Sequence, residues 1–166
     1  MLKRIAVSVL IALVGLISLL PGTAWAPRVK GLPGYTGPCR VLLEDDSIVE
    51  GRFLGDIFVL NYEARGSDLL ANLSITGACT ANGEPYSLSD APATAPVTIL
   101  KSNCNRLDIR LGEATARTTI TVDLSGEDMK STGEKTDRDV LCQIARNRKK
   151  GSPALIADLL NQYFQG

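Results

Sequence analysis

The chain has 166 residues, 45% of them hydrophobic, with 18 basic and 18 acidic side chains. This balance is not typical of proteins that bind nucleic acids or other polyanions through their net charge, so we expect no nucleic-acid partner. The sequence contains no histidine, which excludes Ser-His-Asp and Cys-His catalytic arrangements and imidazole acid–base chemistry.

The N-terminal residues follow the pattern of a secretory signal peptide. Two basic residues precede Ile5–Leu20, sixteen uncharged residues that are followed by PGTAWA. As a helix, this run reaches about 24 Å, less than the ~30 Å hydrocarbon core of a bilayer. We therefore expect residues 1–26 to be a signal peptide, cleaved after Ala24 or Ala26, with retention as a membrane anchor as the alternative. The protein is then secreted or periplasmic.

The next segment predicts an extended linker. Residues 27–38 (PRVKGLPGYTGP) carry three prolines and three glycines, a composition that is typical of connections. The remaining residues, 39–166, are long enough for one domain with a hydrophobic core.

Residues 39–125 have the pattern of β-strands. The clearest strand covers residues 69–80, where a period of two predicts one buried face. Asn82-Gly83 then predicts a tight turn. Glycines inside the long β-rich stretch 48–62 indicate bulges or bends, and the prolines of residues 87–96 predict an irregular connection. The buried face of the strand 69–80 is expected to hold Leu69, Ala71, Leu73, Ile75, Gly77 and Cys79.

A second alternating pattern surrounds Gly112-Glu113, which predicts the two-residue turn of an antiparallel hairpin. One face of this hairpin should be buried and the other exposed to water. A polar loop is expected over residues 125–136. The buried positions would be Leu107, Ile109 and Leu111 before the turn and Ala116, Thr118, Ile120, Val122 and Leu124 after it.

The C-terminal residues change to a helical period. Residues 137–148 and 152–164 predict two helices, and Ser152-Pro153 is a typical cap and first residue for the second. In the second helix Leu155, Ile156, Leu159, Leu160 and Tyr163 form one apolar stripe. The predicted fold is therefore α+β but mostly β: an antiparallel sheet, curled into a sandwich or half-barrel, with two C-terminal helices.

The four cysteines predict two disulfides, as an even number does in a small exported domain. Of the three possible pairings we favour Cys39–Cys79, joining the first strand to one two elements later, and Cys104–Cys142, tying the hairpin base to the first helix. A metal site is not expected, since the chain has neither a C-x-x-C pair nor histidine. We expect no cofactor.

Four segments of the chain carry a family resemblance: GRFLGDIFVLNYEARGSDLLANLSITG, SNCNRLDIRLG, DVLCQIA and LIADLLNQYF. The sequence resembles a group of uncharacterised exported bacterial proteins, over residues 48–164. The resemblance implies a secreted β-rich domain with the Cys104–Cys142 link, but no activity and no functional residues. The chain departs from this group in its more polar loop at 125–136 and in its additional pair Cys39 and Cys79.

Two kinds of charged cluster are candidate sites. The acidic candidates lie in expected turns and polar loops, where solvated carboxylates are ordinary, so we expect no catalytic residue among them. The one basic cluster either complements the dipole at a helix C-terminus or contacts an anionic surface such as lipid or a cell-wall polymer. The acidic candidates are Glu44, Asp45, Asp46, Asp56, Glu127 and Asp128, and the basic cluster is Arg146, Arg148, Lys149 and Lys150.

These observations favour a non-enzymatic exported domain with a structural or binding role at the cell envelope or outside the cell. An alternative is a carrier of an apolar ligand between sheet and helices, which needs a cavity lined by Leu73, Ile75, Ile109 and Ile120. A third hypothesis is a hydrolase with paired carboxylates, which requires two such groups in one pocket and at least one shifted pKa. A partner at the cell envelope, or another protein, is a further hypothesis, and no sequence feature identifies it.

Overall fold

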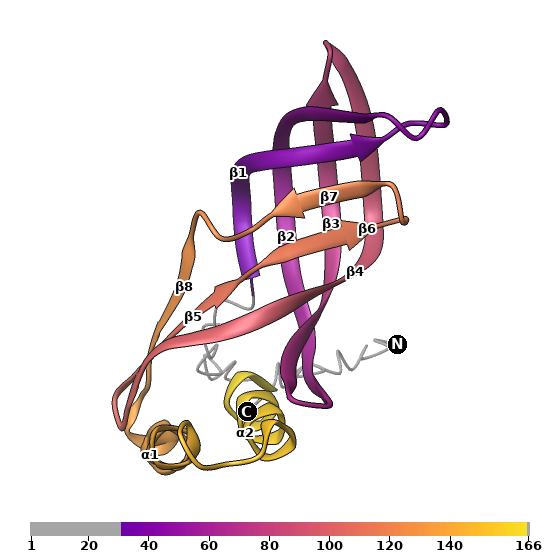
Figure 1. Ribbon diagram of the computed structural model, residues 1–166. Helices are drawn as coiled ribbons and strands as arrows, with labels where there is room; N and C mark the ends of the chain where they lie inside the picture. Colours follow the sequence, from indigo (N-terminus) through magenta and orange to yellow (C-terminus); the bar gives the residue numbers. More distant parts are fainter. Residues whose placement is uncertain (1–30, 166) are drawn as a thin grey trace, which may run out of the picture.

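Eight antiparallel strands and two helices make up residues 31–165, the part of the chain that this computed structural model describes (Figure 1). The predicted fold class is confirmed, and the sheet takes the half-barrel form. The signal peptide, its cleavage positions and residues 27–30 of the predicted linker lie outside the described residues. The elements are β1 (Gly31–Leu42), β2 (Ile48–Arg65), β3 (Asp68–Ala81), β4 (Glu84–Asn103), β5 (Arg106–Leu111), β6 (Glu113–Ala116), β7 (Ile120–Asp123), β8 (Asp128–Thr132), a short 3-10 turn (Lys135–Asp137), α1 (Arg138–Asn147) and α2 (Pro153–Gln165).

The sheet curls because β5 and β6 follow each other directly in the chain but pair with different strands. The strand order is β6-β7-β1-β2-β3-β4-β5-β8, yet β5 runs into β6 through the single residue Gly112. The Gly112 N–H donates to the carbonyl of Pro96 on β4 at 2.9 Å, and the Leu124 N–H donates to the Gly112 carbonyl at 3.4 Å. These bonds bring β6 into contact with β4 and bend the sheet round its core.

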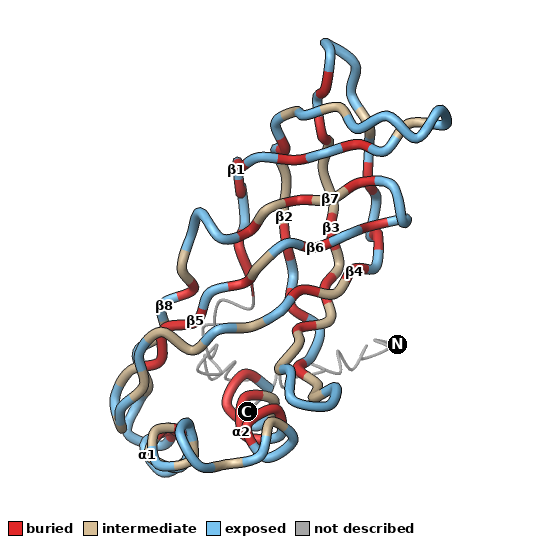
Figure 2. Tube along the Cα trace, viewed as in Figure 1, coloured by how far each residue is buried: buried red, intermediate tan, exposed pale blue. Residues whose placement is uncertain are grey.

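One hydrophobic core fills the inside of this curl. On β3 the residues Ala71, Leu73, Ile75 and Cys79 are buried, as the alternation predicts, and the residues between them are partly exposed. Figure 2 shows the same alternation of buried and exposed residues along the other long strands, and a buried stripe on α2. Removal of these apolar side chains from water is the main force that stabilises the fold.

The glycines of β2 mark close backbone contacts, and one of them lies beside an irregularity of the kind expected. With β3, β2 pairs without interruption through Gly51 and Gly55, and this ladder shifts register between Val59 and Asn61. With β1, the register shifts next to Gly55, between the pairs Tyr35–Gly55 and Leu32–Ile57. Gly55 faces Gly77 on β3, and a Cβ added to Gly55 would lie 2.2 Å from the carbonyl oxygen of Thr76. Two strands can approach this closely only where no side chain intervenes.

The disulfide between Cys39 and Cys79 confirms the first favoured pairing and shows how sharply the sheet curves. It joins β1 to β3, which pair with β2 from opposite sides and not with each other. The two Cα atoms are 6.1 Å apart, whereas two strand spacings in a flat sheet would be about 9.5 Å. Gly51, between them on β2, faces inward like Phe53 and carries no side chain.

Two segments that we expected to be irregular are strands. β1 includes residues 31–38 of the predicted linker, and β4 runs through the proline-containing segment 87–96. β4 pairs with β3 up to Pro96 and with β5 from Val97 onward. Within residues 31–165, β4 before Val97 therefore pairs with a strand on one side only, and a proline whose nitrogen faces the other side removes no ladder bond.

The predicted hairpin around Gly112-Glu113 was also wrong. β5 pairs with β4 and β8, and the hairpin is formed by β6 and β7. Its turn contains Arg117 and Thr118, both with positive φ, so Thr118 is exposed at the turn and not in the core. The other positions, Ala116, Ile120, Val122 and Leu124, are buried as expected. The predicted loop 125–136 contains a further strand, β8, which pairs with β5.

The helices agree with their predicted ranges, 137–148 and 152–164, to within one residue. The Ser152 hydroxyl accepts the Leu155 N–H at 3.2 Å, which is the predicted N-cap of α2. Both helices lie at one end of the curled sheet (Figure 1), where α2 packs on β2 and β3, and α1 on β4. Among the described residues, no helix has the length and apolar character needed to cross a bilayer.

Candidate binding groove between the sheet and the helices

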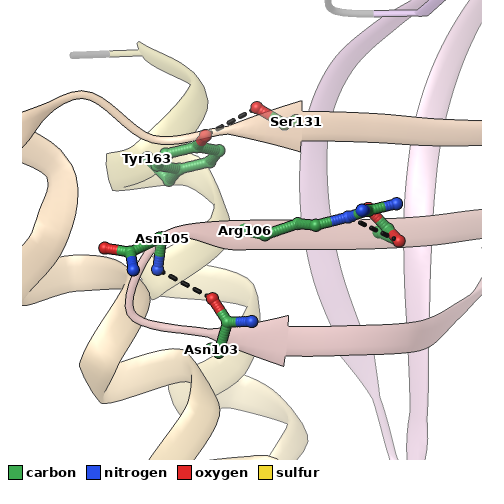
Figure 3. Close-up of polar contacts among 6 residues, drawn as sticks. Asn103, Asn105, Arg106, Ser131 and Tyr163 are labelled. Atoms are coloured by element: carbon green, nitrogen blue, oxygen red, sulfur yellow. Dashed lines mark hydrogen bonds and ion pairs between the residues drawn. The ribbon is translucent and has the colours of Figure 1, made fainter.

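The turn between β4 and β5 presents Cys104 to α1. The side-chain oxygen of Asn103 accepts the backbone N–H of Asn105 at 2.9 Å, which closes the chain around Cys104 (Figure 3). Cys104 forms a disulfide with Cys142, and this confirms the second favoured pairing. Cys142 is part of α1, so the bridge fixes the first helix to the end of β4.

Two further contacts fix α2 to the sheet. Tyr163 on α2 and Ser131 on β8 share a hydrogen bond of 2.5 Å between their hydroxyls (Figure 3). Asn161 uses both atoms of its side-chain amide: its oxygen accepts the Tyr62 N–H at 2.7 Å and its nitrogen donates to the Tyr62 carbonyl at 2.8 Å. The helices therefore have a fixed position relative to the strands beneath them.

This arrangement leaves an open groove where the α1–α2 connection passes over β3 and β4. The groove has a volume of about 290 Å³. Ile156 is buried at its base, and the strand residues that line it are half-buried with the exception of the exposed Thr98. Five of its eight lining residues are apolar, and Arg148 is its one charged residue. The lining residues are Leu69, Val97, Thr98, Ile99, Arg148, Gly151, Pro153 and Ile156.

The predicted basic cluster lies at the rim of this groove. Arg146 is in the last turn of α1, and Arg148, Lys149 and Lys150 follow it in the connection to α2. All four side chains are exposed. Within residues 31–165 no carboxylate forms an ion pair with any of them. Arg148 joins the cluster to the groove because it belongs to both.

A second hollow, of about 170 Å³, lies over β1, β2, β6 and β7, and its charged groups are largely occupied by one another. Arg40 forms an ion pair with Glu113 at 2.7 Å. The pKa of Asp123 is held below its usual value, first by hydrogen bonds from Ser125 and to a smaller degree by the charge of Arg40. In the described part of the chain no group of acidic, histidine or cysteine side chains is arranged to hold a metal ion.

The acidic residues singled out from the sequence do not meet in a hollow. Asp45 accepts hydrogen bonds from Ser47, Asp56 accepts the Gly34 N–H at 2.7 Å, and Asp128 binds Arg110 at 2.7 Å. Glu44, Asp46 and Glu127 are exposed. None of the six lines the groove or the second hollow.

The four residues expected to line a ligand cavity are part of the solid core. Leu73, Ile75, Ile109 and Ile120 are each at most 5% exposed and belong to one buried cluster. None of them lines the groove. Val97, Ile99 and Ile156, which do line it, follow the same apolar patterns as core residues, and only the path of the α1–α2 connection leaves a hollow beside them. The sequence carries no signal for this difference.

A comparison of the chain with protein-family models, with curated proteins and with solved structures found no match.

Proposed function

We propose that this protein is a non-enzymatic binding domain that works outside the cytoplasm and holds a small apolar ligand in the groove between β3, β4 and α2. The observation that carries the proposal is the groove itself, an open hollow with apolar side chains in its lining beside a filled core. Small-molecule sites are concave and mostly apolar with few polar groups, and occupy roughly 300–1,000 Å³. At about 290 Å³ the groove lies just below this range.

The position of the groove also supports binding. Its two sides belong to the sheet and to the helix connection, and the Cys104–Cys142 bridge and the Asn161–Tyr62 contact fix them relative to each other. A site on rigid elements loses little conformational entropy when the ligand binds. The lack of histidine in the sequence favours binding over general acid–base catalysis.

Two disulfides support an oxidising compartment, because such bonds persist mainly in secreted and periplasmic proteins. Together with the signal-peptide pattern of residues 1–26, they support export. The role would then be to bind an apolar ligand at the cell envelope or in the surrounding medium.

Binding of the neutral fluorescent dye N-phenylnaphthylamine to the oxidised protein tests this proposal. Val97→Phe should fill part of the groove and weaken binding at least about tenfold, the effect of ~1.4 kcal/mol. Val49→Phe is the matched control, a half-buried valine on β2 that does not line the groove. The proposal fails if the wild-type protein does not bind the dye, or if both variants bind it equally well.

A further inference from the structure

The charges around the groove bear on the chemistry of its ligand. This inference rests on the function proposed above. Arg148 is the one charged residue that lines the groove, and Lys149 and Lys150 follow it directly. No acidic residue lines the groove. A ligand in the groove would therefore meet apolar side chains along its body and positive charge at the end near Arg148.

The surrounding protein does not neutralise this charge. Arg40, Arg106 and Arg110 of the sheet each bind a carboxylate at 2.7 to 2.8 Å. Arg148 has no such partner in the described residues. Its backbone N–H donates to the Ile144 carbonyl at 2.9 Å, so the main chain at this position is fixed, while its guanidinium keeps its donors for another group.

The favourable interaction of cations with the C-terminus of α1 explains only part of the basic cluster. A cation at a helix C-terminus complements the partial negative charge there, an effect limited to the last turn. Arg146 lies in that turn, but Lys149 and Lys150 lie beyond it. α2 begins at Pro153, which lines the groove, and its first turn contains no acidic residue. The partial positive charge of this second helix end therefore adds to that of the cluster.

We propose that the ligand is a free amphiphile with an anionic headgroup, such as an alkyl carboxylate: its apolar chain lies against Val97, Ile99 and Ile156, and its headgroup binds Arg148 with support from Lys149 and Lys150. A guanidinium binds a carboxylate through two parallel hydrogen bonds, which are stronger than those between neutral groups.

A free molecule fits this site better than the surface of a bilayer. The apolar residues of the groove are recessed: Ile156 is 5% exposed, and Val97 and Ile99 are half-buried. Among the described residues, Leu155 is the one large exposed apolar side chain on the helices, and the remaining five belong to β1 and β2. A recess can enclose the chain of a single amphiphile, whereas a bilayer contacts side chains that project.

Three ligands with the same chain and different headgroups test the inference. Dodecanoate, dodecanol and dodecylammonium are titrated separately against the N-phenylnaphthylamine complex of the oxidised protein, below their micelle concentrations and at low salt. We expect dodecanoate to displace the dye at a concentration about tenfold lower than dodecanol, as one charge-assisted contact allows, and dodecylammonium to be the weakest. Added salt should reduce the preference.

The triple variant Arg148→Gln/Lys149→Gln/Lys150→Gln should lose the preference for dodecanoate over dodecanol, whatever its affinity for dodecanol. Arg117→Gln is the matched control: Arg117 is exposed, lies in the β6–β7 turn and lines no hollow. Circular dichroism and a count of free thiols establish that each variant is folded.

The outcomes separate the two proposals. Equal displacement by dodecanoate and dodecanol overturns the anionic headgroup and leaves the apolar groove intact. Absence of binding by all three ligands and the dye overturns both. If vesicles that contain anionic phospholipid capture the protein through the basic cluster while dodecanoate does not bind, the ligand is a membrane surface and the inference is wrong.

Discussion

Asn161 on α2 replaces a missing neighbour strand for Tyr62 on β2, because its side-chain amide binds both the N–H and the carbonyl of that residue at 2.7 and 2.8 Å. Within residues 31–165, β1 pairs with β2 only as far as Phe58. Without Asn161, the N–H and carbonyl of Tyr62 would have no partner among these residues. A single asparagine thus satisfies one donor and one acceptor that burial would leave without water.

Asn161→Leu should therefore lower the free energy of unfolding by about 2–3 kcal/mol, since it leaves two partly buried backbone groups without partners. Urea unfolding followed by circular dichroism measures the change. Gln162→Ala on the exposed face of the same helix is the control and should change stability by less than about 0.5 kcal/mol. Equal effects of the two substitutions would mean that the amide pairing does not stabilise the fold.

The Cys104–Cys142 bridge should matter most for α1. This helix buries only Leu141 and Ile144, whereas α2 buries six residues. Each disulfide closes a loop of about 40 residues, and removal of either should cost about 4 kcal/mol by the chain-entropy estimate. We expect the variant Cys104→Ser/Cys142→Ser to lose stability and, in addition, to show faster amide hydrogen exchange in α1.

The variant Cys39→Ser/Cys79→Ser is the comparison for that experiment. It should lose similar stability, but the exchange of α1 amides should remain slow relative to the rest of its own fold, because its missing bridge joins β1 to β3. If the two variants show the same pattern of exchange, the bridge at Cys104 has no special role in fixing the helix.

Two tyrosines with different surroundings give opposite predictions. The Tyr35 hydroxyl donates to the Asp123 carbonyl at 2.6 Å, and Tyr35→Phe should cost about 1 kcal/mol. The Tyr62 hydroxyl is buried and has no hydrogen-bond partner in residues 31–165. Tyr62→Phe should therefore leave stability unchanged or raise it by about 1 kcal/mol. Thermal unfolding of both variants tests the two predictions. A clear loss of stability in Tyr62→Phe would show that the Tyr62 hydroxyl has a hydrogen-bond partner.

The parts of the fold that the sequence predicts well are those in which local pattern and tertiary environment agree. The period of two in β3 identifies its buried residues. Asn82 and Gly83 both have positive φ in the β3–β4 turn, a conformation that these two residue types favour. The helical period predicts α1 and α2 to within one residue, and Ser152 caps α2 as expected, whereas Leu155 of the predicted apolar stripe is 40% exposed. In each case the local preference needs no knowledge of distant residues.

The wrong predictions concern segments whose conformation depends on a partner that is distant in the sequence. The glycines and prolines of residues 31–38 are tolerated in β1 because β2 pairs with that strand over nearly its whole length. Gly112 looks like a hairpin turn, but its N–H binds Pro96, sixteen residues earlier, and the strand continues. The groove cannot be predicted from the sequence for the same reason, because it depends on where the α1–α2 connection passes over β4.

Acid should destabilise the protein through carboxylates whose pKa values are lowered in the fold. Hydrogen bonds from Ser47 lower the pKa of Asp45, those from Ser125 lower that of Asp123, and a hydrogen bond from Arg110 lowers that of Asp128. The folded protein then binds fewer protons than the unfolded chain, so this stabilisation is complete above the ordinary value of 3.8 and is lost as the pH falls below it.

Urea unfolding at a series of acidic pH values measures this loss. Asp123→Asn should flatten the dependence, because one of the contributing carboxylates is gone. Glu84→Gln, which alters an exposed carboxylate with no hydrogen bond or ion pair among the described residues, should leave it unchanged. A wild-type stability that does not change from pH 5 to about pH 2 would contradict the assignment.

Alkali should destabilise the protein through Tyr35 and Tyr62. Burial raises the pKa of both hydroxyls above 10.0, and for Tyr35 the charge of Asp123 adds to the effect. Above pH 10 the unfolded chain loses these protons while the folded protein retains them, so the free energy of unfolding should fall as the pH rises further. The double variant Tyr35→Phe/Tyr62→Phe cannot lose either proton. Its stability should therefore decline less steeply between about pH 9 and pH 11 than that of the wild-type protein, and parallel curves for the two proteins would assign the alkaline loss to other groups.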